Sequence, residues 1–343
     1  SDRQWIDENR LFRLANLATG AGKVPPIAEF VASATLHRRI SPDQLNMPFF
    51  EELKTASITF LIHSASGGTG GGLAPAFAEW MKGEGIGGDV ISIVNLGIGD
   101  EAVETPFLVG NALYNFPKIN RAVQMAILID NKVVASKANK NGNGVSRYLN
   151  YIERTILHGR PEYQENSPRE YMLSDRFAYR IMSVLTRLPN DVADIIRHLQ
   201  TDADYNQGAR WLVPYIYPLD SEYETSYEDV PPAYLALRAL EDGGLCDVVP
   251  ENPQGTQVVV LFEAPQGYDR GKAEKDVQQV VAEKLRVRMD QVVVRTPTTP
   301  EGINGVAVTI LWLRPETSFM KTWCDLKENE DDRTRLIDDW HNS

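Results

Sequence analysis

Residues 64–75 read Ser-Ala-Ser-Gly-Gly-Thr-Gly-Gly-Gly-Leu-Ala-Pro, and this stretch decides how the chain is interpreted. Before it stands Ile58-Thr-Phe-Leu-Ile62, a short β-branched and aromatic run that is typical of a buried strand. After it, residues 74–82 have apolar side chains at helical spacing. A strand, a glycine turn and a helix N-terminus together bind phosphate, because free backbone N–H groups there point at the anion. The predicted phosphate-holding residues are Ser66, Gly67, Gly68, Thr69, Gly70, Gly71 and Gly72.

Two familiar phosphate motifs do not fit this loop. No Gly-Lys-Ser/Thr follows it, as the Walker motif requires, and its glycines are spaced differently from those of the dinucleotide fingerprint. A flexible glycine linker is the plain alternative, which the flanking strand and helix disfavour. The loop resembles the Gly-Gly-Thr-Gly-x-Gly signature of the tubulin/FtsZ superfamily, and Ala74-Pro75 extends the match as in FtsZ.

Composition is compatible with a cytoplasmic globular protein. The chain has 343 residues, a length typical of about two domains, and no apolar run long enough to span a membrane. We find no signal-peptide pattern. Two cysteines are too few for a disulfide framework, and the net charge of −12 argues against nucleic acid as a direct partner. We therefore expect a cytoplasmic location.

The order of the patterns predicts an α/β fold with a parallel sheet, followed by an α+β part with a mixed sheet. Helical patterns are expected at 6–18, 26–38, 74–83, 107–124, 148–157, 171–200 with a break near Pro189, 232–241 and 272–285. Strands are expected at 58–62, 90–96, 126–129, 213–218, 257–262, 291–295 and 306–312. The expected divisions are a nucleotide domain (1–170, with an insertion at 136–170), a central helix and activating loop (171–205), a C-terminal domain (206–315) and a charged tail (316–343).

A second glycine segment lies upstream of the first. Thr19-Gly-Ala-Gly-Lys23 precedes a helix opened by two prolines and resembles a further phosphate loop of FtsZ. The resemblance implies phosphate contacts from Gly20, Ala21, Gly22 and Lys23. A plain turn remains the alternative.

Carboxylates follow the strand that ends near Leu96. Asp100 and Glu104 match the spacing of the ribose-contacting acids of tubulin, and carboxylates accept hydrogen bonds from ribose hydroxyls. A solvated acidic loop is the alternative.

The purine base has two expected contacts. Ile129-Asp-Asn131 resembles the guanine-contacting motif of tubulin, and an amide such as that of Asn131 both donates and accepts. In the family an aromatic ring at the start of the central helix stacks on the base. Phe177 is the candidate here, with Tyr171 and Tyr179 as competitors.

Residues 203–215 resemble the segment that one tubulin or FtsZ subunit inserts into its neighbour's nucleotide site. Asp204 falls on the family's aspartate. Three places later, where the family has an acid that polarises the attacking water, this chain has Gln207, which can orient water but cannot take up a proton. Asp202 is an additional carboxylate that either substitutes or faces solvent.

The resemblance covers about residues 15–315 but not the family's beginning. Residues 1–18 lack the glycine-rich loop that opens family members. We expect the missing strands and first phosphate loop to come from another segment or chain.

The resemblance implies a GTP-binding protein that assembles head-to-tail into filaments and hydrolyses GTP where subunits meet, with Mg²⁺ as a second cofactor. Two alternatives stay open. The first is a non-hydrolysing scaffold or nucleotide sensor, suggested by Gln207. The second is an unrelated doubly wound enzyme that uses a dinucleotide.

Overall fold

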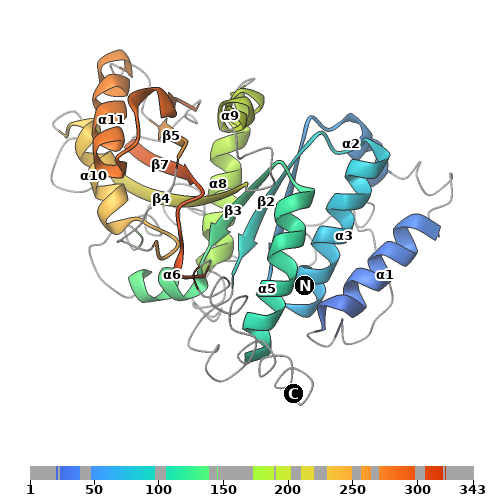
Figure 1. Ribbon diagram of the computed structural model, residues 1–343. Coiled ribbons are helices and arrows are strands. Elements are labelled where there is room, and N and C mark those ends of the chain that lie inside the picture. Colours follow the sequence, from blue (N-terminus) through green and yellow to red (C-terminus); the bar gives the residue numbers. More distant parts are fainter. Residues whose placement is uncertain are drawn as a thin grey trace, which may run out of the picture. The chain divides into compact units, whose positions relative to one another are not determined.

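The computed structural model describes residues 21, 24–38, 48–96, 106–138, 145, 173–188, 191–201, 210–219, 230–248, 256–263, 270–297, 306–319 and 321. They form two compact units whose division falls within β3 (Met125–Ile129), one ending at Ala126 and the other beginning at Ile127 (Figure 1).

The first unit contains a parallel strand pair joined by a helix. β1 (Ile58–Ser64) pairs with β2 (Asp89–Asn95) in a register that runs from Ile58 opposite Asp89 to Ser64 opposite Asn95. Helix α3 (Gly68–Glu84) connects them, as a parallel crossover requires. It ends at Gly85, whose φ of 67° is the left-handed conformation that glycine adopts without strain.

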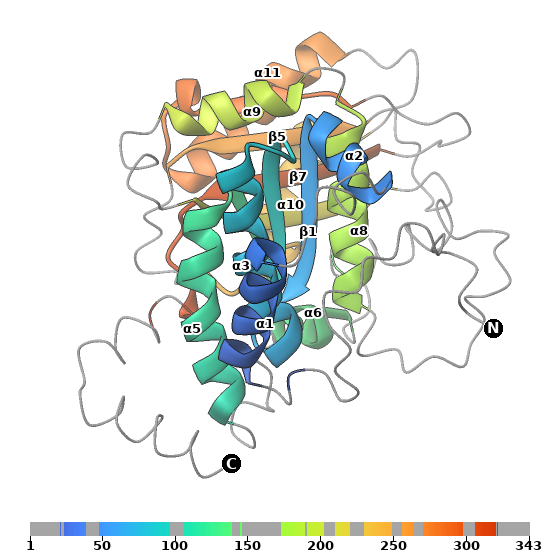
Figure 2. The same ribbon diagram turned by 90° about the vertical axis from the view of Figure 1, so that its right-hand side faces the viewer.

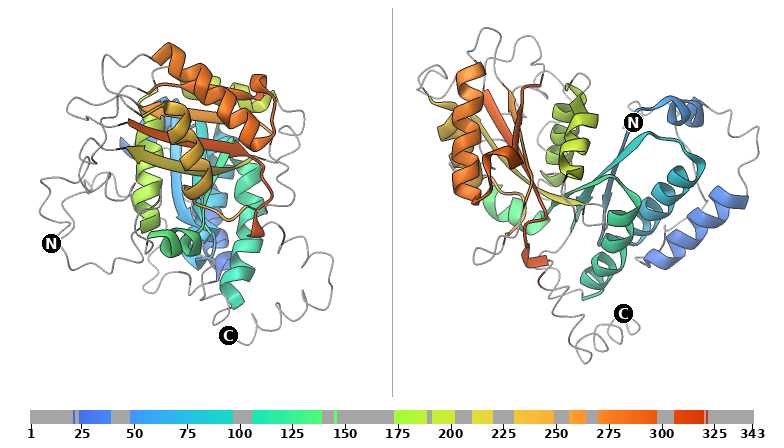
Figure 3. Two further views of the ribbon diagram at one scale, coloured as in Figure 1. Left: turned by 90° about the vertical axis from the view of Figure 1, so that its left-hand side faces the viewer. Right: turned by 45° about the horizontal axis from the view of Figure 1, so that its top comes forward.

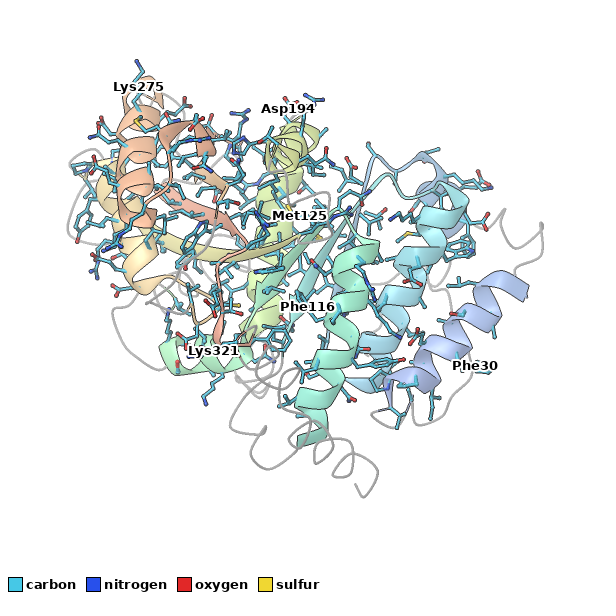
Figure 4. All side chains as sticks on the ribbon, in the orientation of Figure 1. Phe30, Phe116, Met125, Asp194, Lys275 and Lys321 are labelled. Carbon is cyan, nitrogen blue, oxygen red and sulfur yellow. The ribbon has the colours of Figure 1, made fainter. Side chains whose placement is uncertain are left out.

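Three helices lie side by side in this unit. α3 packs between α1 (Pro25–Arg38) and α5 (Pro106–Ala122), and it also contacts β1 (Figure 2). α1 turns a stripe of small and apolar residues inward, namely Ala28, Ala32 and Leu36, and Phe30 points away from α3 (Figure 4). The short helix α2 (Pro48–Thr55) joins through Phe50, whose ring meets Trp80 of α3 edge-on.

The second unit contains four neighbouring strands of a mixed sheet. β4 (Trp211–Leu219), β5 (Val258–Glu263), β6 (Val292–Arg295) and β7 (Val306–Leu313) follow the spatial order β4-β7-β5-β6. β7 is antiparallel to both neighbours, and β5 is parallel to β6. Every residue of β5 is buried, which explains its continuous apolar sequence.

Helices cover both faces of this sheet (Figure 3). α10 (Pro232–Asp242) and α11 (Arg270–Leu285) pack together on one face. α8 (Leu173–Thr186) and α9 (Asp191–Gln200) lie on the other. α6 (Asn131–Ala138) is separated from the end of β3 by one residue and contacts α8.

A buried charge cluster joins α8 to β5. Glu263 is fully buried and accepts hydrogen bonds from Arg180 at 2.6 and 2.7 Å and from Arg187 at 2.5 Å. Two guanidinium groups therefore neutralise one carboxylate inside the unit, and this keeps the helix against the strand.

The structure confirms the predicted α/β class, the parallel pair in the first unit and the mixed sheet in the second. It corrects three details. α3 begins at Gly68 rather than Ala74, α2 was not expected, and the start of the expected 136–170 insertion is the last turn of α6. The helices expected at 6–18 and 148–157 and the charged tail after 321 lie outside the described residues.

Candidate functional site

The glycine-rich loop is shorter than its sequence suggests. β1 ends at Ser64 beside Asn95 of β2, and the Ala65 N–H donates to the Asn95 carbonyl at 2.9 Å. Ser66 follows, with its hydroxyl 2.9 Å from that of Ser64. Gly67 is the helix N-cap in extended conformation, so the remaining glycines, Gly68 to Gly72, lie in the first turns of α3. The loop proper is therefore only Ala65–Gly67.

The N-terminus of α3 has the features of an anion site. The first N–H groups of any helix lack an intrahelical acceptor, and no side chain in the described part of the chain caps them here. The helix dipole adds partial positive charge at this end. Thr69 is exposed in the first turn and carries a hydroxyl there. These donors suit a phosphate group.

The structure brings the two predicted phosphate loops together. The N–H of Ala21 donates to Oγ1 of Thr69 at 3.1 Å. Because the Thr69 oxygen accepts this bond, its own proton stays available for a phosphate oxygen. Gly20, Gly22 and Lys23 lie outside the described residues, so their predicted contacts stay predictions.

The glycines serve two different purposes. None of those at 67–72 has a positive φ, so conformational freedom is not their reason. A β-carbon on Gly71 would lie 2.1 Å from Nδ2 of Asn115, and one on Gly72 would lie 2.2 Å from the Pro25 carbonyl of α1. At Gly67 and Gly70 the nearest atoms lie 3.9 and 3.6 Å away. Gly71 and Gly72 thus allow the neighbouring helices to approach closely, whereas at Gly67 and Gly70 a β-carbon would make only ordinary van der Waals contacts.

The first turns of α3 are weak helix formers by sequence. Four glycines, at 68, 70, 71 and 72, each disfavour a helix by about 1 kcal/mol relative to alanine. Pro75, inside the helix, removes a backbone N–H and costs about 3 kcal/mol in an isolated helix. Packing against α1 and α5 therefore has to supply the stability of this segment.

Two asparagines of α5, not singled out from the sequence, anchor the loop. Nδ2 of Asn115 donates to the Ala65 carbonyl at 2.7 Å, and Nδ2 of Asn111 donates to the Ser66 carbonyl at 2.9 Å. Both side chains are buried. Their four-residue spacing places them on one face of the helix, and that spacing of polar residues was the available sequence signal.

His63 lies at the end of β1, close to Gly70. Its Nε2 is 2.9 Å from the Ser92 hydroxyl of β2. Burial lowers the pKa of His63 to about 4, since the charged form is poorly solvated there. The side chain is therefore neutral near pH 7, and the histidine adds no positive charge beneath the loop.

In the second unit, Asn131 is the first residue of α6 and is exposed. The preceding Asp130 caps this helix, accepting the Lys132 N–H at 2.9 Å. Burial raises the pKa of Asp130 to about 6, against the lowering effect of the backbone hydrogen bonds, and the negative charge of Asp247 adds to the rise. Asn131 thus has a fixed helix start and a side chain that a ligand can reach.

The aromatic candidates differ in exposure. Phe177 of α8 is fully buried, whereas Tyr179 of the same helix is 48% exposed. Tyr171 lies outside the described residues. The thiol of Cys246 is buried and donates to the Leu128 carbonyl at 3.2 Å, and burial raises its pKa, which is typical of an unreactive core cysteine.

The remaining predicted residues, Asp100, Glu104, Asp202, Asp204 and Gln207, also lie outside the described residues, so their roles stay predictions. Within the described part, no group of three or more His, Cys, Asp or Glu side chains is placed to hold a metal ion. No described helix is both long and apolar enough to cross a membrane.

Comparison with solved structures shows that the chain has a tubulin/FtsZ-like fold. It is similar to CetZ2 from Haloferax volcanii in a GTPγS-bound protofilament, at 15% identity and a TM-score of 0.63, over 92% of this chain and 79% of that one. It is also similar to GDP-bound monomeric CetZ1 of the same organism, at 14% identity and a TM-score of 0.61, over 88% and 76%. A mutant FtsZ from M. jannaschii matches at 16% identity and a TM-score of 0.56, over 86% and 74%. No family model and no curated protein matches the sequence.

Proposed function

We propose that this chain is a GTP-binding protein that assembles head-to-tail into filaments and hydrolyses GTP where two subunits meet. The observation that carries the proposal is the uncapped N-terminus of α3 at the end of β1, on a fold shared with GDP- and GTPγS-bound structures. One of those relatives is described as a protofilament.

Each group has a proposed role. The N–H groups at Gly67–Gly70 and the Thr69 hydroxyl bind phosphates, with Ala21 hydrogen-bonded to Thr69. Gly20, Gly22 and Lys23 add further phosphate contacts. Asp100 and Glu104 bind the ribose, and Asn131 binds the guanine. Because Phe177 is buried, Tyr171 or the exposed Tyr179 is the better candidate to stack on the base. Mg²⁺, when bound, neutralises phosphate charge. It would be held mainly by the phosphates and water, consistent with the coordination it prefers.

Hydrolysis is proposed to need a neighbouring subunit. Asp204, with Gln207 or Asp202, orients the attacking water on the nucleotide of the next subunit. Hydrolysis per molecule should then rise with protein concentration, in step with pelleted polymer. An activity per molecule that is constant over the same range, with no polymer, would contradict this mechanism.

Gln207 in place of an acid favours one second candidate, a filament-forming scaffold that binds GTP without hydrolysing it. Asp204→Ala and Gln207→Glu separate the two proposals. In a GTPase the first variant releases less phosphate and the second releases it at a changed rate, while GTP affinity is retained in both. In a scaffold, phosphate release stays at background in the wild type and in both variants.

A further inference from the structure

The glycine-rich loop is held from behind by two side chains of α5. Asn115 and Asn111 donate to two successive carbonyls, those of Ala65 and Ser66. Both amides come from one helix face, four residues apart, and both are buried. The two side chains therefore hydrogen-bond to the backbone of the segment that connects β1 to α3.

These bonds determine where the loop's N–H groups point. In a trans peptide the C=O and the following N–H point in opposite directions. With the Ala65 and Ser66 carbonyls directed at α5, the N–H groups of Ser66 and Gly67 are directed away from it. A β-carbon on Gly67 would make only ordinary van der Waals contact, with Ser64 at 3.9 Å. The donors are thus oriented away from α5 before any ligand arrives.

Folding stability alone does not explain why position 115 is an asparagine. Its Oδ1 is buried and accepts no hydrogen bond among the described residues. A leucine would remove that unsatisfied acceptor and leave one other, the Ala65 carbonyl, so the number of unsatisfied acceptors would not change. Gly71 also has to lack a side chain to admit the Asn115 amide. The unsatisfied Asn115 oxygen and the glycine at position 71 both cost stability, and together they fix the position of the loop.

We propose that Asn111 and Asn115 act as positioning residues for the phosphate site, orienting the backbone donors of the loop and holding the glycine-rich start of α3 in helical form. This inference rests on the proposed nucleotide binding at the same loop. Neither side chain needs to touch the nucleotide, because each acts through a backbone carbonyl. The sites of action are the Ser66 and Gly67 peptide groups.

The test compares the full chain with Asn111→Leu and Asn115→Leu, using Gly110→Ala as a matched control on α5. Gly110 has nothing within 4 Å of its β-carbon position. Affinity for GTPγS with Mg²⁺ is measured by calorimetry, and amide hydrogen exchange of residues 64–73 is measured without nucleotide. We expect each Leu variant to bind at least tenfold more weakly and to exchange faster in this segment, with a melting temperature close to that of the wild type. The control should bind within twofold.

Three results would overturn the inference. If the wild type and both Leu variants bind within twofold of one another, the proposed function survives and the positioning role fails. If nucleotide affinity falls while amide hydrogen exchange of residues 64–73 stays at the wild-type rate, the Asn111 and Asn115 side chains do not act by holding the loop. If the wild type binds no guanine nucleotide, the proposed function fails and the inference with it. Should a Leu variant not fold, Asn111→Ala and Asn115→Ala carry the same expectation.

Discussion

Nδ2 of Asn115 lies 2.1 Å from the point where Gly71 would carry a β-carbon. The Asn115 amide occupies the space that a side chain at position 71 would need. A glycine at 71 and the asparagine at 115 are therefore required together. Gly70, one position earlier, has a contact no closer than 3.6 Å at the same point.

This relationship predicts opposite effects of two adjacent substitutions. Gly70→Ala should raise the free energy of unfolding by up to about 1 kcal/mol, because alanine is the better helix former. Gly71→Ala should lower it by about 1–3 kcal/mol through overpacking. Urea denaturation measures both. Adding Asn115→Ala should recover part of the Gly71→Ala loss, and equal stability of the two single variants would contradict the packing.

His63 predicts an acid-sensitive contribution to stability. Its folded pKa of about 4 lies below the ordinary 6.5, so between these values the unfolded chain binds a proton that the folded chain does not. The contribution is complete above pH 6.5 and is lost as pH falls toward 4. From pH 7 to pH 5 the wild type should lose about 2 kcal/mol more than His63→Gln. Parallel urea titrations at the two pH values check this, and identical losses would refute it.

Asp130 predicts the opposite dependence. Its pKa is raised from 3.8 to about 6, so the folded chain holds a proton in that window and ionisation at higher pH costs stability. Asp130→Asn keeps a side-chain oxygen for the Lys132 N–H and carries no charge beside Asp247. At pH 7 it should be more stable than the wild type by up to about 3 kcal/mol, an advantage that vanishes near pH 4. A variant that is less stable at pH 7 would show that the charged helix cap outweighs burial.

The Glu263 cluster predicts a large loss from a small change. Glu263→Gln leaves Arg180 and Arg187 without their shared carboxylate inside the second unit, which should cost about 3–5 kcal/mol. The comparison is Asp194→Asn, which breaks the exposed pair with Arg197 and should cost less than about 1 kcal/mol. Similar costs in urea denaturation would mean that the buried pairs add no more than the surface pair.

Most of the described elements could be predicted because their apolar patterns are local. The strand at 58–62, the helix pair broken near Pro189 and the valine-rich β5 all follow from periodicity and from backbone chemistry. The start of α3 could not be predicted this way, since four glycines and a proline disfavour a helix by themselves. Packing against α1 and α5 overrides their propensity there.

The site was predicted only in part, for a related reason. The glycine motif located the loop, and the structure joins Ala21 to Thr69 as two neighbouring phosphate segments would require. Asn111 and Asn115 escaped notice because a polar residue in a helix ordinarily indicates the solvent side. Their burial depends on carbonyls some fifty positions earlier in the chain, and their four-residue spacing alone does not reveal that contact.

Ligand-dependent thermal unfolding of the wild type and Gly70→Asp, with GTP, ATP and NAD compared at equal concentrations and with Mg²⁺, tests the central claim most directly. The claim is that the loop at the start of α3 binds a guanine nucleotide. At 100 times its Kd, a ligand stabilises the folded state by about 2.7 kcal/mol. We predict that GTP raises the wild-type melting temperature, that ATP and NAD raise it little, and that Gly70→Asp abolishes the GTP effect by placing a negative charge at the phosphate donors. Stabilisation by NAD instead of GTP, or a full GTP effect in Gly70→Asp, would contradict the account.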